Sequence, residues 1–202
     1  MRLNAQQLRQ LKKPEKLPKI RRYPIYFILE NIYDTYNIGG LFRLADALAI
    51  EKIYLCGECE TPPNHKIKKA SIGTDKIVAW EYKRSAAEII DELRKRYSLL
   101  IIRDSERNKK KKNIQITIIA VEQHPNALPY FKANYQLPLA LIFGNETYGI
   151  LPETLKLADQ IVEIPMFGIN KSLNVIVSAA IVGYHITLAI AAKTRKTTAK
   201  KA

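Results

Sequence analysis

Short runs of apolar residues recur along the chain, and stretches with helical periodicity separate them. The runs occupy residues 24–30, 52–57, 77–82, 114–121, 139–144 and 160–165. They lack the alternation of apolar and polar residues that a strand with one solvent-exposed face would show. Such continuous apolar runs are typical of parallel strands that are covered on both faces. The alternation of strands and helices therefore predicts an α/β domain with a mostly parallel sheet flanked by helices.

The stretches between these runs carry the signals of helices. Apolar residues at helical spacing over residues 41–48 predict a helix that follows a turn at Gly39 and Gly40. Residues 85–96 are amphipathic, and Pro152 stands where proline suits the first turn of another helix.

One segment is compatible with a membrane as well as with a protein interior. Residues 173–192 carry no charged side chain and lie between Lys171 and Lys193. Their length is sufficient to span a bilayer. Asn174 and His185 argue against a span, because polar groups that face lipid are costly. A helix that is apolar on all sides is also found buried between protein surfaces, so the residues alone leave both interpretations open.

Basic residues are concentrated in three segments of the 202-residue chain. The chain has 33 Lys and Arg against 19 Asp and Glu, a formal charge of +14, and residues 1–22, 103–112 and 193–202 hold 19 of the 33. We expect one domain over residues 23–192, with a basic N-terminal extension (1–22) and a basic C-terminal tail (193–202). Nucleic acid is the first partner that this charge indicates, and solvated tails that aid solubility are the alternative.

Several motifs of known chemistry are missing or incomplete. The sequence has no G-x-G-x-x-G, and residues 144–149 have the glycine spacing of a P-loop but continue with Ile150 and Leu151. Cys56 and Cys59 form a lone C-x-x-C, too few ligands for structural zinc, so we expect reduced thiols and no metal site. The basic N-terminus is followed by no apolar stretch, so we expect a cytoplasmic protein without a secretory signal.

Three clusters combine polar residues with turns next to predicted strands or helices. Residues 37–43 begin with Asn37, contain two glycines and end with Arg43, at a strand–loop–helix junction. Residues 143–146 end an apolar strand in a small turn and the carboxylate of Glu146. Residues 164–175 form a loop that leads into an apolar helix, and here Ser172 is interpreted, on its own, as a helix N-cap. Ligands of open α/β sheets bind outside such carboxyl ends of strands.

In chain order these clusters are N-x-G-x-x-x-R, then GNETYG, then I-P-M followed by S-L-N-V. With this signature the chain resembles the SpoU (TrmH-like) branch of the SPOUT RNA methyltransferases over about residues 20–190. The segment AVEQHPNALPY and the residues that follow it are most similar to the type that methylates a guanosine ribose in the tRNA D-loop.

The resemblance implies a fold and an activity. The fold is an α/β domain with a deep trefoil knot over about residues 139–190, an exception to the rule against threaded chains. The family works as a homodimer with the last helix at the subunit interface, which accounts for residues 173–192 without a membrane. The implied activity is methyl transfer from S-adenosyl-L-methionine to a ribose 2′-hydroxyl of tRNA, without a metal. The alternatives are an rRNA 2′-O-methyltransferase, an RNA-binding protein without catalysis, and a membrane-anchored protein.

The resemblance also implies roles for individual residues. Arg43 matches the catalytic arginine, described either as a base or as an electrostatic clamp; a guanidinium stays protonated, which favours the clamp. Asn37 would orient Arg43 or the ribose. The remaining polar positions of the site match Glu146, Ser172 and Asn174. The cofactor-binding positions match Val121, Gly144, Ile164, Met166 and Leu173. The segment Arg103–Lys112 has no counterpart in the family pattern, and it is either an extension of the preceding helix or a loop.

Overall fold

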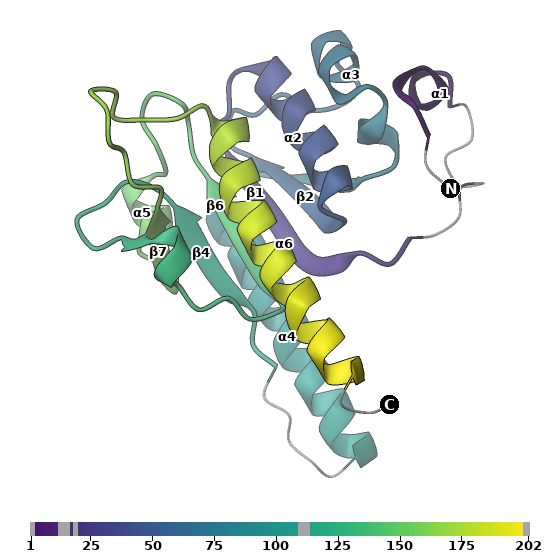
Figure 1. Cartoon of the computed structure of the whole chain (residues 1–202), viewed down its shortest axis with the longest axis vertical. Helices are drawn as coiled ribbons and strands as arrows, with labels where there is room; N and C mark the ends of the chain where they lie inside the picture. Colours follow the sequence, from purple (N-terminus) through teal and green to yellow (C-terminus); the bar gives the residue numbers. More distant parts are fainter. Residues whose placement is uncertain (1–2, 12–16, 18–19, 109–113, 200–202) are drawn as a thin grey trace.

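The computed structural model describes residues 3–11, 17, 20–108 and 114–199, in which seven strands form one parallel sheet (Figure 1). The strand order is β3-β2-β1-β6-β4-β7-β5. The strands are β1 (Tyr23–Glu30), β2 (Ile50–Cys56), β3 (Ala79–Lys83), β4 (Thr117–Val121), β5 (Leu128–Pro129), β6 (Leu139–Phe143) and β7 (Gln160–Glu163). The expected mostly parallel sheet is confirmed, with β5 as an additional edge strand of two residues.

The apolar runs form strands that are covered on both faces. All five residues of β6 are buried, and β6 pairs with β1 on one side and β4 on the other. Phe27 and Leu29 of β1 pack into the core on one face, and Tyr26 and Ile28 pack into the core on the opposite face. Because neighbouring side chains of a strand point to opposite faces, continuous burial requires helices on both.

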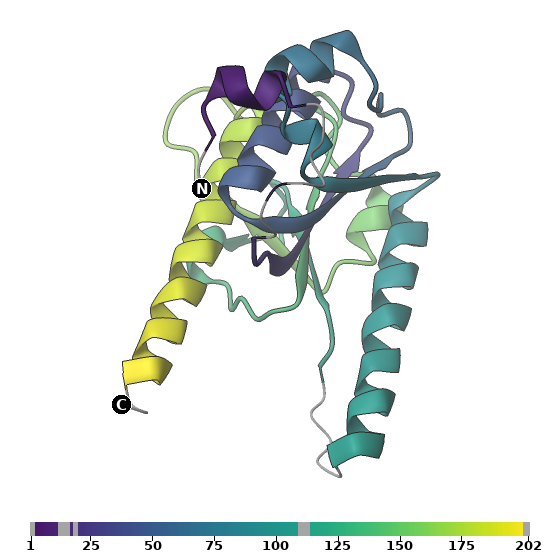
Figure 2. The same cartoon turned by 90° about the vertical axis from the view of Figure 1, so that its right-hand side faces the viewer.

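The helices divide between the two faces of the sheet (Figure 2). One face is covered by α2 (Thr35–Ala47), α3 (His65–Ser71) and α6 (Val175–Ala199). The other face is covered by α4 (Ala86–Asn108) and the short α5 (Pro152–Leu155), which has proline at its start as expected. The N-terminal helix α1 (Ala5–Arg9) and the 3₁₀ helices η2 (Thr74–Lys76) and η3 (Tyr130–Lys132) complete the described elements.

Helix α2 begins earlier than its apolar pattern indicates. The helix begins at Thr35, because the side chain of Asp34 accepts a hydrogen bond from the backbone N of Tyr36 at 2.8 Å and caps it. Residues 39–40 therefore lie inside the helix, and the expected turn there is wrong.

The two glycines of α2 allow other helices to approach its backbone closely. A Cβ on Gly39 would lie 2.6 Å from the Cβ of Ala70 in α3, and a Cβ on Gly40 would lie 2.4 Å from Cδ1 of Ile176 in α6. No side chain fits at either position without movement of the neighbour. The glycines thus let α3 and α6 pack directly against α2.

Helix α6 is buried along one side and exposed along the other. Val182 and Ile186 pack into the core, whereas Tyr184 and Leu188 are exposed. By length and composition Val175–Ala192 is able to cross a membrane, and 28% of this segment is buried inside the protein. Within Val175–Ala192, one side of the helix therefore packs on the core and the side with Tyr184 and Leu188 is open to solvent.

Two of the three basic segments continue helices of the fold where they are described, and the N-terminal segment forms a helix of its own. Residues 103–108 continue α4, so of the two alternatives for this segment the structure shows a helix extension that far, while 109–112 lie outside the described residues. In the N-terminal extension Ala5–Arg9 forms α1. In the C-terminal tail residues 193–199 continue α6, and 200–202 lie outside the described residues.

Candidate active site

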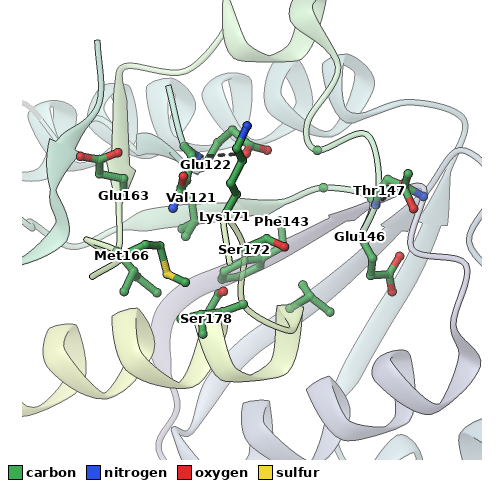
Figure 3. A pocket seen from close by; sticks show the side chains of 17 residues that line it. Val121, Glu122, Phe143, Glu146, Thr147, Glu163, Met166, Lys171, Ser172 and Ser178 are labelled. Atoms are coloured by element: carbon green, nitrogen blue, oxygen red, sulfur yellow. Dashed lines mark hydrogen bonds between the residues drawn. The ribbon is translucent and has the colours of Figure 1, made fainter. Parts of the chain in front are cut away.

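A pocket of about 290 Å³ lies at the carboxyl ends of β4, β6 and β7 (Figure 3). The parallel strands end at this edge of the sheet, so the loops that follow them surround one cavity. Its lining includes every residue matched to cofactor binding, namely Val121, Gly144, Ile164, Met166 and Leu173. Glu146 and Ser172 also line the pocket, whereas Asn37, Arg43 and Asn174 do not.

The glycine-containing loop after β6 closes on itself. Asn145 and Gly149 exchange two backbone hydrogen bonds of 3.0 and 2.9 Å. A Cβ on Gly144 would lie 2.3 Å from the backbone N of Ile150, and Gly149 has a φ of +71°. The loop therefore folds back on itself in this way only with glycine at these two positions. The glycine spacing of residues 144–149, which is that of a P-loop, therefore follows from the backbone conformation of this loop.

Glu122 anchors this loop to the end of β4. Its backbone N donates to the carbonyl of Val162 in β7 at 3.0 Å. Its carboxylate accepts hydrogen bonds from the backbone N of Ile150 and of Gln123, both at 2.9 Å. The side chain thus links two walls of the pocket that it lines. The sequence carries no signal of this role, because a carboxylate after a strand does not indicate which loop it will meet.

A second carboxylate holds the far end of the same loop. Glu30, at the end of β1, is only 3% exposed. It accepts hydrogen bonds from the backbone N of Leu151 at 2.9 Å and from Oγ1 of Thr154 at 2.6 Å. These bonds satisfy the buried carboxylate and fix the start of α5 against β1.

A chain of hydrogen bonds joins the three sequence clusters. Asn37 Nδ2, on α2, donates to Glu146 Oε1 at 2.8 Å, and Asn174 Nδ2, before α6, donates to Asn37 Oδ1 at 3.0 Å. Asn37 is 7% exposed, whereas Glu146 is exposed. The structure thus brings together residues that are 109 and 137 positions apart in the sequence.

The N-cap of α6 is Asn174 and not Ser172. Asn174 Oδ1 accepts a hydrogen bond from the backbone N of Ile176 at 2.8 Å, and the helix begins at Val175. Asn174 therefore uses its oxygen to cap α6 and its nitrogen to hold Asn37. The capping interpretation of Ser172 is wrong, and its exposed side chain lines the pocket instead.

Arg43 lies on α2, nearly two turns after Asn37, and its side chain is exposed. Among the described residues it has no hydrogen-bond or ion-pair partner. The structure does not bring Arg43 into the pocket of its own chain. The guanidinium is instead available to an anion that approaches from outside.

The sequence and the fold were compared with known proteins. The family model described as "SpoU rRNA Methylase family" matches residues 24–184. The chain belongs to this family. The tRNA (guanosine(18)-2′-O)-methyltransferase of Thermus thermophilus is 27% identical over 168 residues, which cover 83% of this chain and 76% of the relative. The enzyme of the same name from Escherichia coli K12 is 26% identical, with 81% and 63% covered.

Solved structures of SpoU proteins have the same fold. AviRb of Streptomyces viridochromogenes, in complex with the cofactor AdoMet, has a TM-score of 0.70 at 23% identity, over 84% of this chain and 58% of that one. The TrmH/SpoU tRNA modifying enzyme of A. aeolicus has a TM-score of 0.70 at 22% identity, over 94% and 84%. The matched region spans less than two thirds of AviRb and of the E. coli relative.

The pocket of this SpoU methylase combines apolar walls with acidic side chains. Glu122, Glu146 and Glu163 line it together with a single basic residue, Lys171. Glu163 and Met166 lie at one end, and Glu146 lies at the other (Figure 3). This excess of carboxylates favours a ligand that carries positive charge and hydroxyl groups.

The cysteines of this SpoU methylase are structural. Cys56 and Cys59 are both buried, and each thiol donates to the carbonyl of Leu29, at 3.4 and 3.3 Å. Burial raises the pKa of both thiols, that of Cys59 to about 11, so neither is a thiolate at neutral pH. Within the described residues no group of three His, Cys, Asp or Glu side chains is placed to hold a metal ion.

Proposed function

We propose that the protein transfers a methyl group from S-adenosyl-L-methionine to a ribose 2′-hydroxyl of tRNA, with a guanosine of the D-loop as target. The observation that carries this proposal is the hydrogen-bonded chain Glu146–Asn37–Asn174, which unites the three family motifs beside the pocket. The relatives named as tRNA (guanosine(18)-2′-O)-methyltransferases support the choice of substrate.

The pocket suits the proposed cofactor. Val121, Ile164 and Leu173 offer aliphatic surface for an adenine ring. Glu122 and Glu163 offer carboxylates for ribose hydroxyls and for the positive charge of the ligand. A volume of about 290 Å³ is near the lower end of ligand pockets. When bound, the cofactor supplies a methyl group that its sulfonium already activates.

The polar residues position the RNA and manage its charge. Arg43 stays protonated, clamps a phosphate next to the target and stabilises negative charge that develops on the 2′-oxygen. One oxygen of Glu146 is held by Asn37, and the other accepts a hydrogen bond from the substrate. Ser172, exposed at the pocket, adds a hydroxyl to the same site. Most of the rate gain in this scheme comes from positioning.

We further propose a cytoplasmic homodimer in which the domain of residues 23–192 is knotted over about 139–190. The exposed side of α6, with Tyr184 and Leu188, supports a second subunit as the partner of this helix. Val175 and Ser178 at the start of α6 line the pocket. A partner on α6 would therefore stand next to the site.

Methyl transfer to a defined tRNA tests the function. The purified protein is incubated with labelled S-adenosyl-L-methionine and a tRNA transcript, and ribose methylation is mapped. We expect label at the D-loop guanosine, and no label when that nucleotide carries 2′-deoxyribose. Transfer to rRNA alone would favour the rRNA alternative. Binding of tRNA without any transfer would favour the non-catalytic RNA-binding protein.

A further inference from the structure

A group of lysines covers the outer side of α3. Ile67 and Ser71 of this helix are buried, whereas Lys66, Lys68 and Lys69 are exposed. None of the three lysines pairs with a carboxylate in the part of the chain that the structure describes. Residues 64–76 contain four lysines and a single acidic residue. The outer side of α3 therefore carries positive charge that its own chain does not neutralise.

Helix α3 is held next to the stretch of α2 that carries Arg43. The position of a Cβ on Gly39 would be 2.7 Å from the carbonyl oxygen of Ile67 and 2.6 Å from the Cβ of Ala70. Gly39 and Arg43 are four residues apart on one helix and thus share a side of it. Helix α3, which carries the lysines, therefore packs against the side of α2 that Gly39 and Arg43 share.

The N-terminal helix α1 lies beside α3 (Figures 1 and 2). The carbonyl oxygen of Leu8 is 2.5 Å from the position that a Cβ on Gly73 would take. Lys76 Nζ donates to the carbonyl of Leu11 at 3.0 Å. Arg9 of α1 is exposed. The described part of the basic extension with α1 is therefore attached to the domain next to α3.

We propose that Lys66, Lys68 and Lys69, with Arg9 of the docked α1, form a surface that binds RNA phosphates next to Arg43. The proposal rests on the proposed function, because it names where the RNA substrate lies. The charge of these side chains complements a polyanion. No exposed large apolar side chain of the described residues lies on α1 or α3, and membrane-surface helices combine basic with apolar residues. RNA is therefore the partner that this surface fits.

The salt dependence of tRNA binding tests the proposal. In the full-length protein, the triple substitution Lys66→Gln, Lys68→Gln and Lys69→Gln removes three phosphate contacts. The slope of log affinity against log salt should then flatten by about 2. The loss of affinity should be about 16-fold greater at 50 mM than at 200 mM salt, by the same relation. Arg9→Gln alone should flatten the slope by less than one.

A matched control removes the same charge elsewhere. Lys95, Lys132 and Lys156 are exposed and belong to α4, to η3 and to the end of α5. Their replacement by Gln should leave the slope unchanged. Equal flattening in the two triple variants would overturn the proposal, because net charge alone would explain it. An unchanged slope in the α3 variant would also overturn it.

Two further measurements distinguish a failure of this proposal from a failure of the proposed function. Thermal unfolding and binding of S-adenosyl-L-methionine should be the same in the α3 variant and the unsubstituted protein, since the side chains of the three lysines are exposed and form no ion pair within the described residues. If the unsubstituted protein methylates tRNA and the α3 variant keeps its slope, the proposed function stands and this surface is refuted. If the unsubstituted protein binds no tRNA, both are refuted.

Discussion

The substitution Asn37→Asp probes the hydrogen-bonded chain at the centre of the site. Asn37 is nearly buried, donates to Glu146 at 2.8 Å and accepts from Asn174 at 3.0 Å. Aspartate keeps the acceptor that Asn174 uses. It replaces the donor that Glu146 uses with a second carboxylate, so an attractive contact becomes a repulsive one.

The size of the effect follows from the distance between the two groups. Two unit charges about 2.8 Å apart repel by roughly 6 kcal/mol at an effective dielectric constant of about 20. Glu146 is exposed and will turn towards water, which removes most of this repulsion. The loss of a hydrogen bond to a charged group remains, at about 1.5–3 kcal/mol. We therefore expect Asn37→Asp to lower the free energy of unfolding by about 2–3 kcal/mol near neutral pH.

The effect should depend on pH in a defined direction. Repulsion from Glu146 raises the pKa of the introduced carboxylate in the folded state above its value in the unfolded chain. The destabilisation is then fully present above this folded-state pKa. It shrinks as the pH falls through the folded-state pKa, because protonation relieves the repulsion and restores a donor.

Urea unfolding of a double-mutant cycle measures the interaction. The variants are Asn37→Asp, Glu146→Gln and the two combined, at about pH 7 and about pH 5. In the combined variant the new amide can donate to the new carboxylate, so we expect a favourable coupling of about 1–2 kcal/mol near pH 7. Additive effects at both pH values would refute the hydrogen bond as described.

Four more outcomes follow from the structure. Arg43→Ala should lower methyl transfer to tRNA by orders of magnitude. It should leave the affinity for S-adenosyl-L-methionine within a few-fold in calorimetry, because Arg43 lies outside the pocket. An equal loss of methyl transfer and of cofactor affinity would contradict the assignment of Arg43 to the RNA. Gly39→Ala should lower the free energy of unfolding by about 1–2 kcal/mol, because the Cβ of Ala70 and nearby backbone block it. Gly40→Ala should change the free energy of unfolding by less than about 1 kcal/mol, because only the end of the Ile176 side chain must move. If urea unfolding gave the same loss of stability for both glycine variants, these contacts would be contradicted. Calorimetry with a chelator should give the same affinity for S-adenosyl-L-methionine as without it, and abolished binding would show that a metal is needed.

The local pattern of the sequence was sufficient for six of the seven described strands and for the edge of the sheet at which the pocket lies. Runs such as 139–144 are apolar at every position, and this alone predicts a strand covered on both faces. Ligands of open α/β sheets bind at the carboxyl ends of strands, and Val121, Gly144 and Ile164, which the family resemblance matched to cofactor binding, line one pocket at that edge. Strand β5 was missed, because two residues carry no periodicity.

Only the tertiary structure decided which distant side chains bind one another. The contacts of Asn37 with Glu146 and Asn174 depend on β6 lying beside β1 and on α6 packing against α2. Gly39 and Gly40 were taken for a turn, because the helices that press on them come from elsewhere in the chain. The anchoring roles of Glu30 and Glu122 have the same origin. A hydrogen bond or close contact between remote segments requires their relative position, which local propensity does not contain.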